Sequence, residues 1–199
     1  ELKKTNLTHF RGISMNFRMD RSKLTLSIQP RPTNSRGNDM DDKLPALSLL
    51  NTDSHAHWME QAFREAEKAF AYKEVPVGAV VVLNNQIIGK GYNQRESLND
   101  PTAHAEILAI TAAANHIEDW RLKDATLYVT LEPCPMCAGA ILNARIPRVV
   151  FGADDHEHGG CGGAIQLCSG KYLNHKVEII GGILENKCKG ILDSFFTAS

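Results

Sequence analysis

The chain has 199 residues, a formal net charge of −1 and a hydrophobic share of 43%, which is enough apolar side chain to build one core. No apolar run approaches the ~18 residues that a membrane-spanning helix needs, so no membrane partner is expected. The charge divides into +4 over residues 1–50 and −5 over the remainder, which excludes a generic polyanion-binding surface on the larger part. Five cysteines, an odd number, without a secretory segment favour a reducing compartment.

Residues 1–52 are expected to form a disordered N-terminal extension, and residues 53–197 a folded domain. The stretch from Ile28 to Asp39 is polar and rich in turn-forming residues, with little to bury. A transit peptide for organellar import is the alternative, but such peptides carry few acids, and this segment has several. They are Asp20, Asp39, Asp41 and Asp42. We therefore expect a cytoplasmic protein, with organellar import through residues 1–52 as the open alternative.

The first predicted elements of the domain are a helix and a hairpin. Apolar residues recur at three- and four-residue spacing from Trp58 to Phe70, which predicts an amphipathic helix that begins near Asp53. Two apolar segments, residues 77–83 and 86–93, flank Asn84 and Asn85, a pair that favours a compact turn. These two segments are therefore expected to pair as neighbouring strands.

Helices and strands alternate over the rest of the domain. Asp100 can cap a helix and Pro101 suits its first position, so a helix is expected from there to about Asn115. The later elements are expected as strands at 125–131, 148–152 and 176–180, and as helices at 135–144 and 185–196. The long segment between the last two strands can hold a short helix and permits a parallel crossover. This order predicts a three-layer α/β/α fold, with a mixed five-stranded sheet and helices on both faces.

Two short motifs carry the chemistry of this domain. His104-Ala105-Glu106 opens a predicted helix, and Pro133-Cys134-Pro135-Met136-Cys137 follows a predicted strand about 30 residues later. His104, Cys134 and Cys137 suit zinc, and three protein ligands leave the fourth tetrahedral position open for water, as in catalytic zinc sites. This pairing of motifs is the known signature of zinc-dependent deaminases that act on nucleobases. One Zn²⁺ per subunit is therefore expected.

Glu106 is the candidate catalytic acid and base. It lies two residues from His104, which is expected in the first turn of the same helix, so it does not share the side of the helix that faces the metal. A carboxylate placed there can take a proton from the attacking water and return it to the ring nitrogen and the leaving ammonia. Taken alone, Glu106 is better explained as a first-turn acid favoured by the helix dipole, and the neighbouring ligand set is what favours the catalytic interpretation.

Six segments resemble the bacterial tRNA-specific adenosine deaminases, and the resemblance covers about residues 54–196. They are 74–79, 91–93, 100–107, 125–140, 148–153 and 174–179. The resemblance implies the cytidine deaminase-like fold, a homodimer and a tRNA anticodon stem-loop as substrate. It also implies conversion of the wobble adenosine, position 34 of the tRNA, to inosine.

The resemblance further implies substrate-binding residues. Asn93 matches a position that hydrogen-bonds the flipped base, and Asp155 matches one that touches the RNA backbone near the target. Pocket-lining positions are matched by Pro76, Val77, Ala103 and Pro133. On spacing alone, Asn93 is a turn residue and Asp155 a solvated loop acid, so both alternatives stay open.

The segment 154–163 departs from the pattern of these relatives. Gly163 stands where they usually have serine, and His156, His158 and Cys161 lie close together in sequence. A second metal site is conceivable there, but we interpret the segment as a polar loop. The chain also lacks the basic C-terminal tail of many relatives. Its candidates for a local RNA-binding patch are Lys73, Arg95, Arg121, Lys123, Arg145, Arg148, Lys171 and Lys176.

Three other functions remain open from the sequence. The nearest is a deaminase of a free nucleobase or nucleoside, of guanine or cytosine type, which shares the zinc chemistry. A noncatalytic, zinc-stabilised RNA-binding subunit is the second, although it has no use for Glu106. A redox protein with a Cys134–Cys137 disulfide is the third, because an isolated Cys-x-x-Cys also occurs in that class.

Overall fold

The structure is a computed structural model that describes residues 52–169 and 176–198. The expected N-terminal extension, apart from residue 52, lies outside the described residues, as does Lys171. Helix α1 (Thr52–Ala71) comes first, one residue before the expected start, and is followed by strands β1 (Gly78–Leu83) and β2 (Gln86–Tyr92). None of the described helices is both long and apolar enough to cross a lipid bilayer.

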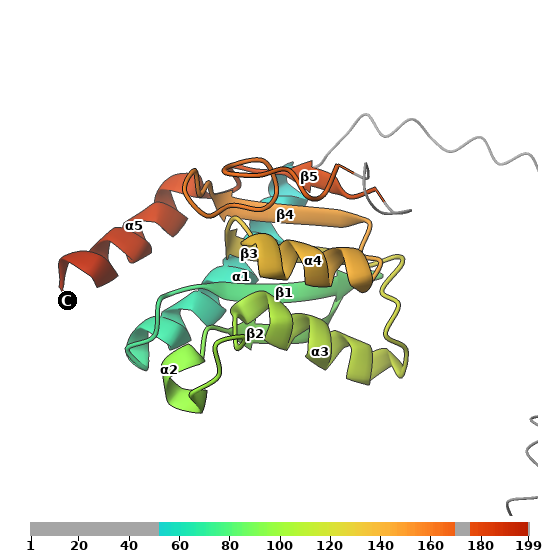
Figure 1. The fold of residues 1–199 in the computed structure, drawn as a ribbon, viewed down its shortest axis with the longest axis horizontal. Helices are drawn as coiled ribbons and strands as arrows, with labels where there is room; N and C mark the ends of the chain where they lie inside the picture. Colours follow the sequence, from blue (N-terminus) through green and yellow to red (C-terminus); the bar gives the residue numbers. More distant parts are fainter. Residues whose placement is uncertain (1–51, 170–175, 199) are drawn as a thin grey trace, which may run out of the picture. The chain divides into compact units, whose positions relative to one another are not determined.

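One five-stranded sheet forms the centre of the domain, with the order β2-β1-β3-β4-β5 (Figure 1). Strands β3 (Thr126–Leu131), β4 (Arg148–Ala153) and β5 (Glu178–Ile180) are parallel to one another, and β1 is antiparallel to both of its neighbours. The expected mixed sheet is thereby confirmed. The long connection between β4 and β5 has no helix in its described part, residues 154–169, although its length permits one.

The hairpin of β1 and β2 is closed by the predicted asparagine pair. Asn84 and Asn85 both have positive φ, 50° and 58°, which is the conformation that a two-residue hairpin turn requires. Asparagine tolerates this left-handed region better than most residues, because its short polar side chain bonds locally. The sequence pair therefore sets the register in which Leu83 faces Gln86, and a bulge between Val81 and Val82 then shifts the pairing so that Gly78 faces Tyr92.

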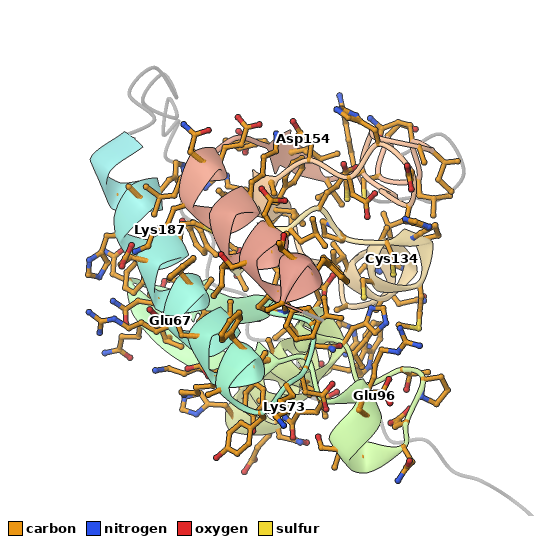
Figure 2. The ribbon with its side chains drawn as sticks, turned by 90° about the vertical axis from the view of Figure 1, so that its left-hand side faces the viewer. Glu67, Lys73, Glu96, Cys134, Asp154 and Lys187 are labelled. Atoms are coloured by element: carbon orange, nitrogen blue, oxygen red, sulfur yellow. The ribbon has the colours of Figure 1, made fainter. Side chains whose placement is uncertain are left out.

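Helices cover both faces of the sheet, which completes the three layers (Figure 1). Helices α3 (Ala105–Ile117) and α4 (Pro135–Asn143) lie on one face, over a core that includes Val81, Leu127 and Ile141. Helices α1 and α5 (Glu185–Thr197) lie on the other face and run side by side in Figure 2. This arrangement is the three-layer fold that the element order predicts.

Two details of the helices differ from expectation. Helix α3 begins at Ala105 rather than Pro101, because Asp100 caps a turn instead: its Oδ1 accepts the backbone amide of Thr102 at 2.8 Å. A short helix, α2 (Arg95–Leu98), occupies the preceding loop, where no helix was expected.

The approach of α3 to β2 requires glycine in the strand. A Cβ atom on Gly91 would lie 2.3 Å from the carbonyl oxygen of Ala105, far inside contact distance. The first turn of α3 therefore rests directly on the strand. This contact fixes the distance between the sheet and the helix end that carries His104 and Glu106.

Candidate active site

His104 and Cys134 occupy equivalent places, each immediately before the first turn of a helix. Both have extended backbone angles, with ψ of 152° for His104 before α3 and 170° for Cys134 before α4. His104 is therefore the N-cap residue and does not lie in the first turn, contrary to expectation, because α3 starts later. Pro135 is the first residue of α4, where its missing N–H costs nothing.

These two helix ends bring three donor atoms together. The Sγ atoms of Cys134 and Cys137 lie 3.7 Å and 3.6 Å from Nδ1 of His104. All three donor atoms lie within 4.8 Å of one another, and no other such cluster is found in the described ranges. The three residues therefore form a set able to hold a metal ion. Cys137 is fully buried, whereas Cys134 and His104 are partly exposed.

The pKa values of the two thiols are shifted in opposite directions, down for Cys134 and up for Cys137. The hydrogen bond from Cys137 lowers the pKa of Cys134 to about 4, and His104 adds to the effect against the cost of burial. The same hydrogen bond, together with burial, raises the pKa of Cys137 above its usual range. One thiolate is therefore stabilised at the site, and thiolate is the form that binds metals.

Glu106 is almost fully buried beside the donor cluster, with 4% of its surface exposed. Burial raises the pKa of its carboxyl group, against the opposing effects of its own backbone amide and of His104. It also interacts with the thiol of Cys137. Glu106 and the donor atoms therefore belong to one site, as the motif spacing predicts.

A cavity of about 390 Å³ opens onto this cluster, within the size range of small-ligand sites. Its lining includes His104, Glu106 and Cys134. The other lining residues are Val75, Val77, Asn93, Arg95, Ala105, Leu131, Glu132, Asp155 and His158. The cavity is thus formed by the helix ends together with the segments that follow α1, β2, β3 and β4.

The residues expected to bind substrate divide into two groups. Val77, Asn93 and Asp155 line the cavity, although they come from three separate segments. The lining does not include Pro76, Ala103 and Pro133, which are buried next to lining residues. The carbonyl oxygen of Ala103 accepts the amide of Gln94, and that of Pro133 accepts the amide of Gly160. The structure thus places the first group at the cavity and the second behind its walls.

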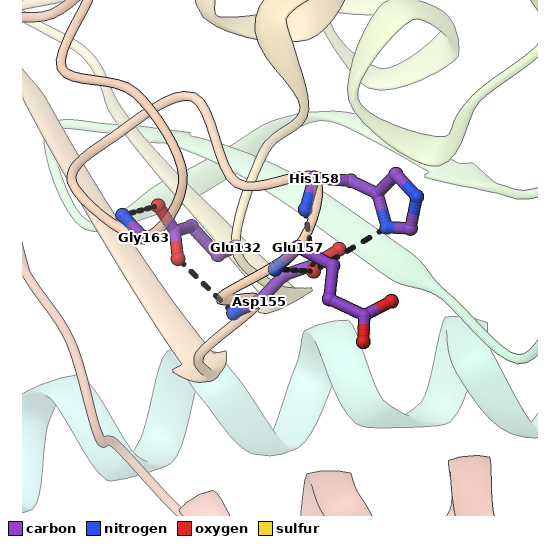
Figure 3. A network of polar contacts seen from close by, with 5 residues as sticks. All are labelled: Glu132, Asp155, Glu157, His158 and Gly163. Atoms are coloured by element: carbon purple, nitrogen blue, oxygen red, sulfur yellow. Dashed lines mark hydrogen bonds and ion pairs between the residues drawn. The ribbon is translucent and has the colours of Figure 1, made fainter.

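Two buried glutamates hold the cavity walls and are missing from the sequence-based expectations. Glu132, 3% exposed, accepts the amide of Cys161 at Oε1, within 3.0 Å. Figure 3 shows two further hydrogen bonds, from the amide of Gly163 to Oε1 and from that of Asp155 to Oε2, also within 3.0 Å. Glu74 plays a similar part on the opposite wall. The sequence signal for both is weak: a charged residue beside an apolar segment.

The loop 154–163 is built on polar contacts, and within the described residues it does not gather three metal donor atoms into one cluster. Oδ1 of Asp155 accepts the amides of Glu157 and His158 and lies 3.6 Å from Nδ1 of His158 (Figure 3). Cys161 faces a different partner, with its Sγ 3.6 Å from that of Cys168. The side chains of His158 and Cys161 therefore turn to separate neighbours.

The candidate basic residues do not gather at the cavity. Arg95 is the one member of the set, within the described ranges, that lines it. Arg121 pairs with Asp119, and Arg148 pairs with Glu178 at 2.7 Å. A local patch on this wall therefore consists of Arg95 and the exposed His158.

The family comparison identifies the class of protein. The family model for MafB19-like deaminases matches residues 53–199, which is nearly the whole described domain. The mixed sheet, the three donor side chains and the buried Glu106 are together the features of a nucleobase deaminase.

Individual relatives narrow the class. A tRNA-specific adenosine deaminase of Bacillus subtilis (strain 168) is 49% identical over 140 residues, covering 70% of this chain and 86% of the relative. One of Streptococcus pyogenes serotype M18 is 43% identical over 144 residues, covering 72% and 91%. A solved structure from studies of A-to-I editing by tRNA:A34 deaminases superposes with a TM-score of 0.66 at 43% identity, covering 68% and 99%. The chain belongs to the family of tRNA-specific adenosine deaminases.

Proposed function

We propose that this protein converts the wobble adenosine of a tRNA, position 34, to inosine by hydrolytic deamination. The observation that carries the proposal is the site itself: His104, Cys134 and Cys137 converge beside a buried Glu106, and a cavity opens onto this cluster. The substrate follows from the relatives, which are named tRNA-specific adenosine deaminases at 43% and 49% identity.

The donor set fits Zn²⁺. With zinc bonds of about 2.3 Å to sulfur and 2.0–2.1 Å to nitrogen, a tetrahedral ion separates these donors by about 3.6 Å. The distances from Nδ1 of His104 to the two sulfurs are 3.7 Å and 3.6 Å. Two thiolates and one imidazole are also the ligand types that zinc prefers. When bound, zinc supplies a Lewis acid that makes water a nucleophile near neutral pH.

Glu106 moves the protons in the proposed reaction. Its carboxylate accepts a proton from the water whose oxygen bonds to C6 of adenine, and it passes that proton to N1 of the ring. It then transfers the second proton of the water to the exocyclic nitrogen as the C6–N bond breaks. Ammonia leaves and a carbonyl group remains at C6, which is inosine. A nearly buried carboxylate suits this part, because solvent does not compete for its protons.

The remaining cavity residues bind and orient the nucleotide. We propose that the side-chain amide of Asn93 hydrogen-bonds the flipped base, because Asn93 lines the cavity and is 5% exposed. Val77 supplies apolar surface, and Pro76, Ala103 and Pro133 support the wall from behind. Asp155 at the rim is placed to meet the RNA backbone near the target nucleotide. The base must leave its stack to reach C6, as in other enzymes that act on bases.

The anticodon stem-loop is the proposed macromolecular partner, and a second copy of the chain the proposed subunit partner. An open depression lies between α3 and α4, with Trp120 at its edge, 54% exposed. Large exposed aromatics of this kind are typical of subunit contacts. Multi-angle light scattering of the purified protein tests the dimer, and a mass of one chain would contradict it.

The substrate is tested with an anticodon stem-loop that carries adenosine at position 34, alongside free guanine, cytosine and adenosine. We expect inosine in the RNA and no ammonia from the free compounds. Ammonia from a free base without inosine in the RNA would replace this proposal with a free-base deaminase. A stem-loop with adenosine only at position 37 serves as the control for position.

A further inference from the structure

Glu74 is a buried carboxylate that no step of the proposed reaction uses. It follows the end of α1, where Lys73 takes a left-handed conformation with φ of 60° and the amide of Glu74 bonds to the carbonyl of Ala69 at 2.9 Å. This capping geometry turns the chain away from the helix. It leaves Glu74 only 1% exposed, at the base of the cavity wall, and not on the surface of α1.

The carboxylate joins two parts of the cavity wall that lie about 20 residues further along the chain. Its Oε2 accepts Nδ2 of Asn93 at 3.3 Å and the amide of Glu96 at 3.2 Å, and its Oε1 accepts the amide of Ser97 at 2.7 Å. Figure 2 shows Lys73, beside Glu74 in the chain, near α2 with its Glu96. Glu74 therefore anchors both Asn93 and the helix α2, which begins at the cavity-lining Arg95.

This hydrogen bond also decides which end of the Asn93 amide faces Glu74. A carboxylate only accepts hydrogen bonds, so the nitrogen of the amide must turn to it and the oxygen must turn away. Burial would raise the pKa of Glu74, but the hydrogen bonds from Ser97 and Glu96 outweigh burial and lower it. The carboxylate is therefore charged at neutral pH, and its preference for the nitrogen end does not change with protonation there.

We propose that Glu74 is a positioning residue for substrate binding, which acts by fixing the orientation of the Asn93 amide. The inference rests on the proposed function, because Asn93 is taken there as the residue that bonds the base. Without Glu74, the amide can rotate, and about half of the orientations present the wrong group to the base. Loss of Glu74 is therefore expected to weaken binding of the RNA and to leave the rate of the chemical step little changed.

A double-mutant cycle tests this role, with Glu74→Gln, Asn93→Ala and the double variant assayed on the wobble-adenosine stem-loop. Glutamine keeps the volume but cannot accept at both ends, so we expect KM to rise about tenfold with kcat changed far less. Asn93→Ala is expected to raise KM similarly. The double variant is expected to match Asn93→Ala alone, because no side-chain amide is then left for residue 74 to orient, and the oxygen of glutamine still accepts a backbone amide of α2.

Glu65→Gln is the matched control, since Glu65 is also a buried carboxylate, 4% exposed, but pairs with Lys68 on α1. It is expected to leave KM unchanged. Effects of Glu74→Gln and Asn93→Ala that multiply in the double variant would overturn the proposal, as would a loss confined to kcat. If Glu74→Gln is too unstable to purify, Glu74→Asp, which shortens the side chain and keeps the charge, takes its place in the cycle. Failure of the wild-type protein to form inosine would instead remove the proposed function, so the two failures are distinguishable.

Discussion

The amide of Gly163 donates a 2.8 Å hydrogen bond to Oε1 of Glu132, a residue that lies 31 positions earlier in the chain. The bond closes the loop after β4 onto the end of β3, where the metal-binding motif begins. A Cβ atom on Gly163 would lie 2.1 Å from the carbonyl oxygen of Asp155 and 2.5 Å from Oε2 of Glu132. The loop therefore closes in this form only around glycine.

Gly163→Ala is expected to push the loop away from Glu132 and to displace Asp155 at the rim of the cavity. Overpacking of this kind costs about 1–3 kcal/mol of stability, and the misplaced rim lowers kcat/KM about tenfold or more. Thermal unfolding and stem-loop kinetics measure the two effects. Gly190→Ala is the control, because nothing lies within 4 Å of its added Cβ in α5, and helix propensity stabilises it by about 0.5–1 kcal/mol. Equal stability and activity of the two variants would refute the role of Gly163.

Cys137→Ser is expected to release the metal. Serine is a poor zinc ligand, so the zinc content after dialysis falls from about one ion per chain to near zero, and activity is lost with it. Metal analysis measures the content, and X-ray absorption of the wild-type protein is expected to report two sulfur ligands and one imidazole.

Cys188→Ala provides the comparison for that variant. Cys188 is also fully buried, but it belongs to α5 and packs into the core on the other face of the sheet from α3 and α4. The Cys188→Ala variant is expected to lose some stability and to keep its zinc and its activity. Zinc loss from Cys188→Ala, or zinc retained by Cys137→Ser, would show that the ligand set is wrong.

His55 is expected to make the fold sensitive to mild acid. It is buried, with Nδ1 2.9 Å from the hydroxyl of Tyr128. Burial lowers its pKa below 6.5, Arg148 lowers it further, and Glu178 opposes both. The unfolded chain therefore binds the proton more readily, so this stability is fully present above about pH 6.5 and is lost as the pH falls below it.

The unfolding free energy is therefore expected to be smaller at pH 5.5 than at pH 7.5. Urea denaturation of the wild-type protein and of His55→Gln at the two pH values measures it. The glutamine variant should show a flatter dependence, whereas His57→Gln, at the exposed neighbouring histidine, should behave as wild type. A wild-type slope in His55→Gln would assign the effect to other groups.

The sequence predicts the sheet and the cluster of three donor side chains because both depend on local signals. The asparagine turn fixes the hairpin, and the spacing of His104, Cys134 and Cys137 specifies donors whose convergence then needs only two helix ends. The predicted start of α3 was wrong. Asp100 and Pro101 are a favourable cap and first residue for a helix, but the chain uses them for a turn, and α3 begins at Ala105. A helix start and a tight turn both favour these residue types, so the local sequence does not distinguish between them.

The supporting carboxylates could not be predicted in the same way. Glu74 and Glu132 bond backbone amides 22 to 31 residues further along the chain, and every residue except proline offers such an amide. No spacing rule marks those partners, so only the folded arrangement identifies them.

Glu106 offers the most direct test of the account, through one comparison of inosine formed at position 34 by wild-type protein and by Glu106→Gln. Both proteins are first shown to carry equal zinc, because glutamine keeps the size of the side chain and leaves the three donors untouched. The account predicts conversion by the wild type and a rate at least about 10²- to 10⁴-fold lower for the variant. A Glu106→Gln variant that forms inosine at the wild-type rate would contradict it.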